Sequence, residues 1–193
     1  MTGPTAARLD EQVPVATAAD MRYLGERLSG LLRAGDLIVL SGPLGAGKTT
    51  LAQGIGAGLG VRGQVTSPTF VIARVHPSLG AGPDLVHADA YRLGSRAEVD
   101  DLDLDADLAT AVTIVEWGDG LVEDLADSFL LISIELGADP TTASDADAGA
   151  RIVRVTGSGE RWQQAESGAA TRQALAGFAA SRPDCPAGHP SRN

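Results

Sequence analysis

The sequence is poor in several features that would point to common classes of protein. Its one cysteine, Cys185, lies in the polar ending SRPDCPAGHPSRN, so an internal disulfide is impossible and a thiol catalyst is not expected there. It has no run of about 18 apolar residues, and its first residues contain no apolar segment of the kind that directs secretion. We therefore expect a soluble, cytoplasmic protein that does not span a membrane.

Basic residues are also scarce. The 193 residues include 15 Lys and Arg against 25 Asp and Glu, which gives a formal net charge of −10. Binding to a nucleic-acid backbone requires clustered cations that release counterions, and the arginines here are scattered without a basic run. We therefore expect no DNA binding and no broad RNA-binding surface of the chain's own.

Lysine is the rarest cation, because Lys48 is the only one in the chain. It lies in VLSGPLGAGKTTLAQGIG (residues 39–56), where Gly42, Gly47, Lys48 and Thr49 fit the phosphate-loop pattern G-x-x-x-x-G-K-[ST]. An apolar, β-branched run precedes the loop and a segment with helical spacing follows it, as the pattern requires. The sequence therefore predicts a strand, a phosphate-binding loop and a helix in succession.

The residue types in this loop suit a bound triphosphate. Glycines let successive backbone N–H groups turn toward phosphate oxygens, and the N-terminus of the following helix adds a favourable dipole. Lys48 offers a compact ammonium to the β and γ phosphates, where a planar guanidinium would be too large and wrongly shaped. Thr49 offers its hydroxyl to Mg²⁺, and Thr50 is placed to reach an α or β phosphate oxygen. Phosphate binding thus explains why a single lysine stands among arginines.

The rest of the chain alternates helix-like and strand-like segments. Thr17 and Asp20 form a capping pattern ahead of an amphipathic helix at 21–32, and Ser95 with Glu98 opens another helix. Strands are expected at 37–41, 69–75, 85–91, 113–117, 129–136 and 151–157. This interleaving predicts a three-layer α/β domain with a mostly parallel central sheet.

The expected domain covers residues 17–180. A flexible N-terminus is expected at 1–16 and a disordered tail at 181–193. Near the domain's end, Trp162, Leu175 and Phe178 can share one face of a terminal helix, and packing on the domain is preferred to a partner site.

Two carboxylates follow strand-like segments. Glu116 comes at the end of the apolar run in AVTIVEW, where ligands bind in open α/β sheets, and alternation in LVHADAY places His87, Asp89 and Tyr91 on one face. Taken alone, an acidic residue after a strand is more often a cap or turn residue, and a lone histidine is more often structural.

Taken together with the phosphate loop, these segments form a pattern that is more specific for one family than either carboxylate alone. GPLGAGKTT, TSPTF, HADAYRL and IVEW, in this order and at this spacing, resemble the TsaE (YjeE) family of bacterial P-loop ATPases for tRNA threonylcarbamoyladenosine formation. The resemblance runs from about residue 17 to 156 and implies the P-loop NTPase fold, with a sheet that is mixed rather than purely parallel. It implies nucleotide binding by Gly45, Ala46, Gly47, Lys48, Thr49, Thr50 and Arg151.

The resemblance also implies roles in catalysis. Thr49 and Glu116 match the Mg²⁺ ligands, and Asp89 matches an acidic residue near the phosphates. With Lys48, these two carboxylates are the candidates for catalysis. TSPTF (residues 66–70) matches a mobile loop compared with a GTPase switch.

The function implied by the resemblance is ATP binding and slow, Mg²⁺-dependent hydrolysis. The protein would act on the transferase made of TsaB and TsaD, which modifies adenosine 37 of tRNA, and the partners would make most tRNA contacts. Two alternatives remain open. A small-molecule kinase would share the phosphate loop and could use Arg92 and Arg96 in a lid, and a nucleotide-dependent binding switch would have binding as its output. Guanine specificity through N-K-x-D is disfavoured, because the only asparagine is Asn193.

Overall fold

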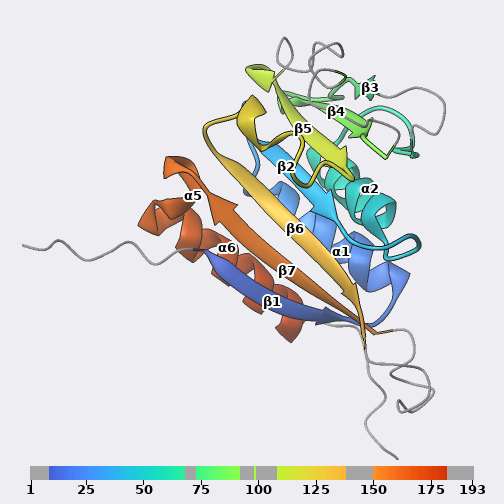
Figure 1. Cartoon of the computed structure of the whole chain (residues 1–193), viewed down its shortest axis with the longest axis vertical. Helices are drawn as coiled ribbons and strands as arrows, with labels where there is room; N and C mark the ends of the chain where they lie inside the picture. Colours follow the sequence, from blue (N-terminus) through green and yellow to red (C-terminus); the bar gives the residue numbers. More distant parts are fainter. Residues whose placement is uncertain (1–8, 68–72, 92–97, 99–107, 138–149, 182–193) are drawn as a thin grey trace, which may run out of the picture.

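The computed structural model describes residues 9–67, 73–91, 98, 108–137 and 150–181 (Figure 1). The strands in these residues are β1 (Asp10–Val15), β2 (Leu37–Ser41), β3 (Ala73–His76), β4 (Asp84–Asp89), β5 (Ala111–Glu116), β6 (Phe129–Leu136) and β7 (Arg151–Ser158). The helices are α1 (Ala18–Ser29), α2 (Lys48–Leu59), α5 (Glu160–Gln163) and α6 (Ala165–Ala180), with a short 3₁₀ helix η1 (Glu123–Leu125). None of the described helices is long and apolar enough to cross a membrane.

The strands form one sheet in the order β1-β7-β6-β2-β5-β4-β3. Its centre is parallel, since β2 pairs in parallel with both β5 and β6, and β5 pairs in parallel with β4. The edges are antiparallel, where β7 pairs with β6, β1 with β7, and β3 with β4. The expected α/β fold is confirmed, and the sheet is mixed at its edges. The carboxyl ends of the four parallel strands meet at one edge, which is where ligands bind in such sheets.

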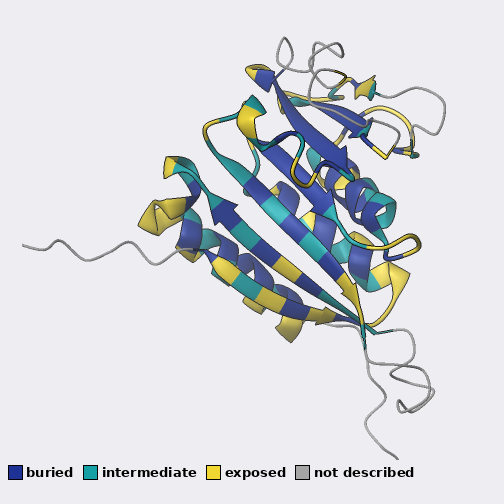
Figure 2. Ribbon diagram, in the orientation of Figure 1, coloured by how far each residue is buried: buried dark blue, intermediate teal, exposed yellow. Residues whose placement is uncertain are grey.

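Buried residues lie on both faces of the central strands. Along β2, Ile38 and Leu40 pack into the core that includes residues of α1, α2 and α6, whereas Leu37 and Val39 pack into a second core on the opposite face. Figure 1 shows the three helices lying behind the sheet, and Figure 2 shows the buried central strands between the two cores. The helix expected to begin at Ser95 lies outside the described residues, apart from Glu98.

The first helix begins as its sequence predicts. The Thr17 hydroxyl accepts a hydrogen bond from the Asp20 N–H at 3.1 Å, and the Thr17 N–H donates to the Asp20 carboxylate at 3.0 Å. This capping box pairs two backbone groups that a helix start otherwise leaves without partners. The glycines of α2 have a packing reason, because a Cβ at Gly54 would collide with the backbone of Arg22 in α1.

The N-terminal segment corrects one expectation. Residues 10–15 form β1 rather than part of a flexible N-terminus, with Val13 and Val15 buried and the alternate positions more exposed. The segment pairs with β7, and Val13 stands opposite Val153. Pro14 is compatible with this strand because β1 lies at the edge of the sheet, where alternate backbone positions face away from the neighbouring strand.

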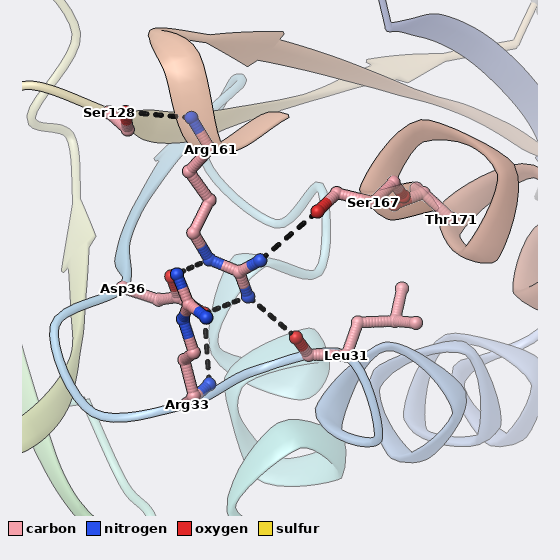
Figure 3. Close-up of polar contacts among 7 residues, drawn as sticks. All are labelled: Leu31, Arg33, Asp36, Ser128, Arg161, Ser167 and Thr171. Carbon is pink, nitrogen blue, oxygen red and sulfur yellow. Dashed lines mark hydrogen bonds and ion pairs between the residues drawn. The ribbon is translucent and has the colours of Figure 1, made fainter. Parts of the chain in front are cut away.

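The C-terminal helices are fastened to the domain by an ion pair that joins distant parts of the chain. Figure 3 shows the Arg161 guanidinium facing the Asp36 carboxylate, with N–O distances of 2.5 and 2.7 Å. The same guanidinium donates to the carbonyl of Leu31 at 2.9 Å and to the hydroxyl of Ser167 at 3.3 Å. The Asp36 side chain is only 3% exposed, so this pair is largely shielded from water.

Apolar packing also holds the C-terminal helices. Trp162, Leu175 and Phe178 are all buried in the core that also contains residues of α1 and α2, so the predicted packing is confirmed. The prediction of a single terminal helix is wrong, because Trp162 lies on α5 and the other two residues lie on α6. The expected tail begins at Ser181, which caps α6, and residues 182–193 lie outside the described part of the chain.

Candidate functional site

The phosphate loop lies between β2 and the start of α2, at the carboxyl edge of the parallel strands (Figure 1). Gly47 is the N-cap of α2 with φ of +111°, a left-handed conformation that a residue with a Cβ rarely adopts. Its carbonyl accepts the first helical hydrogen bond, from Leu51 N–H at 2.9 Å. The following N–H groups and the positive end of the helix dipole therefore face the loop, which favours binding of an anion.

Lys48 is buried within this loop, with 4% of its surface exposed. Its Nζ donates hydrogen bonds to the carbonyls of Gly42 at 2.7 Å and Pro43 at 2.9 Å. The ammonium also lies 3.6 Å from the ring centroid of Trp117, a cation–π contact. Burial lowers the pKa of Lys48, and the nearby carboxylates of Glu116 and Asp89 oppose that shift.

Thr49 and Glu116 are in direct contact. The Thr49 hydroxyl is 2.8 Å from Glu116 Oε1 and 3.0 Å from Oε2. Glu116 ends β5, and its register partner on the neighbouring strand β2 is Leu40, just before the phosphate loop. The fold thus brings a carboxylate from the end of a parallel strand to the first turn of α2.

Asp89 lies beside this pair. It ends β4 and is the register partner of Glu116, so the two carboxylates occur at equivalent points of adjacent parallel strands. Its Oδ2 accepts a hydrogen bond from the Ser67 hydroxyl at 3.1 Å, and its Oδ1 accepts one from the Tyr91 N–H at 3.0 Å. Ser67 belongs to the TSPTF segment, of which residues 68–70 lie outside the described part. The structure therefore brings Asp89 to the site through strand pairing.

His87 has a contact that the sequence interpretation did not anticipate. Its side chain is fully buried, and Nε2 lies 2.9 Å from Oε1 of Glu116. The alternation in β4 had placed His87 and Asp89 on one face, and they do share the face that carries Glu116. Tyr91 differs, since it follows the end of the strand and is 68% exposed.

Trp117, which follows Glu116, is a second residue with an unexpected place in the site. It is the one non-glycine residue with positive φ (+60°) in the described part of the chain, and its N–H donates to the Leu40 carbonyl at 3.0 Å. Its ring contacts Lys48 on the phosphate loop and Tyr91 at a centroid distance of 5.2 Å. The sequence signal for this residue was its position directly after the glutamate of IVEW. A residue that follows a candidate ligand at the end of a strand lies close to the same site.

Arg151 reaches the loop from β7. Its Nε donates to the carbonyl of Ala46 at 2.8 Å, although the two residues are 105 positions apart in sequence. Of the other residues predicted to bind nucleotide, Gly45 and Thr50 belong to the loop and to the first turn of α2. Arg92 and Arg96, on which the kinase alternative depends, lie outside the described residues.

The donors at this site fit magnesium chemistry. Mg²⁺ prefers oxygen ligands and is commonly held by one or two protein oxygens, with phosphate oxygens and water completing its shell. The Thr49 hydroxyl and the Glu116 carboxylate are such oxygens, already within 3.0 Å of each other. Within the described residues there is no group of three or more His, Cys, Asp or Glu side chains arranged to hold a metal. A metal held here would therefore take its remaining ligands from phosphate oxygens or water.

The site combines a glycine loop that caps α2, a buried lysine, and a threonine in the first turn of α2 that contacts a carboxylate at the end of β5. These features define a protein of the P-loop NTPase class. Comparison with known proteins makes the assignment narrower. The family model "Threonylcarbamoyl adenosine biosynthesis protein TsaE" matches residues 15–143. The chain belongs to the TsaE family.

Its relatives include curated TsaE proteins from several bacteria. The chain is similar to "tRNA threonylcarbamoyladenosine biosynthesis protein TsaE" of Streptomyces coelicolor, with 61% identity over 76% of this chain and 96% of that protein. The protein of the same name from Bacillus subtilis is 36% identical over 62% of this chain and 74% of its own length.

A solved structure shares the fold. The crystal structure of Bacillus subtilis YdiB aligns with a TM-score of 0.65 and 24% identity, and covers 90% of this chain and 98% of that one.

Proposed function

We propose that this protein binds ATP with Mg²⁺ and hydrolyses it slowly to ADP and phosphate, in support of threonylcarbamoyladenosine formation at adenosine 37 of tRNA. It acts on the transferase complex of TsaB and TsaD. Membership of the TsaE family supports the pathway. The observation that carries the nucleotide chemistry is the Thr49–Glu116 contact next to the buried Lys48 at the phosphate loop.

Each side chain has a role that its position supports. The backbone of Gly45 to Thr50 surrounds the phosphates, and Lys48 exchanges carbonyl contacts for phosphate oxygens. Arg151 holds the loop through the Ala46 carbonyl while its charge favours the anionic ligand. Thr49 and Glu116 would hold Mg²⁺, which supplies charge neutralisation at the phosphates.

Asp89 would orient the attacking water or the outer waters of the metal. It is adjacent to Glu116 in the sheet but does not bond to Thr49, so its carboxylate is available for a different task. Because the Ser67 hydroxyl donates to its carboxylate, the position of Ser67 and the orientation of Asp89 depend on each other.

Phosphate release with purified protein tests the enzymatic part. ATP with Mg²⁺ should yield phosphate without any added small acceptor, and ATP should compete better than GTP in calorimetry. A requirement for an acceptor would identify a kinase instead, and nucleotide binding without hydrolysis would identify a binding switch.

Recovery of TsaB and TsaD on the immobilised protein, with and without ATP, tests the partner assignment. The net charge of −10 supports a division of labour in which the partners contact tRNA. Tight binding of bare tRNA by the isolated protein at physiological salt would contradict that division.

A further inference from the structure

His87 is placed in the site in a way that a structural histidine does not need. Its ring is fully buried on β4, and Nε2 faces Oε1 of Glu116 at 2.9 Å. A carboxylate can only accept hydrogen bonds, so Nε2 carries the proton and donates it. Among the described residues, Nδ1 has no hydrogen-bond partner although it is buried. Among the described residues, the one hydrogen bond of the ring is therefore the one to Glu116.

This arrangement costs stability. A buried polar atom without a partner costs about 1–3 kcal/mol, and an apolar side chain of similar size would avoid that cost. The contact that the histidine makes in return is with the carboxylate proposed to bind magnesium. A position that sacrifices stability for one directed hydrogen bond indicates that the orientation of the acceptor matters.

Glu116 needs such a contact because it is almost fully buried. Its side chain is 4% exposed, and among the described residues the side-chain donors in contact with it are the Thr49 hydroxyl on α2 and the His87 ring on β4. Thr49 is itself a proposed ligand and changes its contacts when a metal binds. His87 then remains the donor that fixes the carboxylate from the adjacent strand.

We propose that His87 is a positioning residue that holds the Glu116 carboxylate in the orientation needed to bind Mg²⁺ together with Thr49. It does not touch nucleotide or metal itself. The inference rests on the proposed function, since it assumes that Glu116 and Thr49 bind the metal. Hydrogen bonds that support a metal ligand commonly change metal affinity by about 10- to 100-fold when removed.

The test compares two substitutions of His87 that differ in one hydrogen bond. His87→Leu removes the donor, whereas His87→Gln keeps an N–H near the position of Nε2. Calorimetry measures the effect of added Mg²⁺ on nucleotide binding at a fixed ATP concentration. We expect the leucine variant to need about 10- to 100-fold more Mg²⁺ than the original protein to reach half of the maximal effect. The glutamine variant should stay close to the original protein, and binding of ATP in excess chelator should be the same in all three.

His76 provides a matched control. It is also buried and also has a ring nitrogen without a partner among the described residues, but it lies on β3. His76→Leu should leave the Mg²⁺ requirement unchanged. If His87→Leu does not fold, His87→Asn replaces it, because its shorter amide ends near Nδ1 and leaves Glu116 without this donor.

Two outcomes overturn the inference. One is that the variants without the donor need no more Mg²⁺ than the original protein. The other is that the Mg²⁺ requirement of the glutamine variant rises as much as that of the leucine variant. Comparison of His87→Leu with Glu116→Gln separates this inference from the proposed function. If Glu116→Gln alone removes the Mg²⁺ dependence and His87→Leu does not alter it, only the role of His87 is wrong. If Glu116→Gln also keeps the full Mg²⁺ dependence, the proposed metal site is wrong.

Discussion

Replacement of Lys48 by arginine tests whether the phosphate loop requires the shape of lysine and not only its charge. The ammonium fits between the carbonyls of Gly42 and Pro43, at 2.7 and 2.9 Å, and the ring of Trp117 at 3.6 Å. A guanidinium adds two heavy atoms and cannot occupy that space without displacing the loop or the indole. The variant therefore keeps the charge and loses the phosphate contact.

The size of the loss follows from the contact removed. A hydrogen bond that involves a charged group contributes about 1.5–3 kcal/mol, so nucleotide affinity should fall about 10- to 150-fold. Isothermal titration of ATP with Mg²⁺ measures it, and the thermal unfolding midpoint shows whether the variant is folded. Lys48→Met is the control that removes the charge at similar length and should bind at least as weakly. Arginine-variant affinity within about twofold of the original would refute the requirement for lysine.

The remaining predictions concern the carboxylates, the C-terminal ion pair and a buried histidine. Glu116→Gln should weaken the Mg²⁺ dependence of nucleotide binding, whereas Asp89→Asn should bind ATP and Mg²⁺ normally without hydrolysis; full ATPase activity in both would refute these assignments. Arg161→Met should lower the free energy of unfolding in urea by about 3–5 kcal/mol because Asp36 stays buried without its partner, and a loss below about 1 kcal/mol would contradict this. Burial lowers the pKa of His76 from 6.5, so the unfolded chain takes up more protons and stability should fall as pH drops below 6.5. His76→Leu should show a smaller loss over the same pH range, and equal slopes would contradict the explanation.

The phosphate loop could be predicted from sequence because its chemistry is local. The residues from Gly42 to Thr50 are contiguous, and the strand and helix that flank them have clear patterns. Glu116 could also be placed, since the apolar run before it identifies a strand end. The pairing of β4 with β5 then brings Asp89 alongside, which the sequence suggested only through the family resemblance.

The antiparallel edges could not be derived from the same patterns. The segment DEQVPV contains two acidic residues and a proline, which are unfavourable in strands, and only pairing with β7 makes residues 10–15 a strand. Alternation in residues 151–157 identifies a strand but does not give its direction. Direction depends on which neighbour it meets, and β7 lies between β6 and β1.

Contacts between distant segments were beyond the reach of sequence patterns. Arg161 and Asp36 are 125 residues apart, and neither is in a motif. The positive φ of Trp117 is equally hidden, because tryptophan has no preference for that conformation. Both features depend on the whole fold.

The charges around Lys48 bear on the role proposed for the metal. Lys48 is the only lysine in a chain with a net charge of −10, and two carboxylates, Glu116 and Asp89, lie close enough to influence its pKa. A triphosphate that approaches Lys48 therefore also approaches these carboxylates, and in a buried site their repulsion is poorly screened. A divalent cation held by Glu116 and Thr49, as proposed, would convert part of that repulsion into attraction. Under the proposed function, the carboxylate that would oppose free ATP would favour ATP with Mg²⁺, so the charges around the single lysine would select the metal complex.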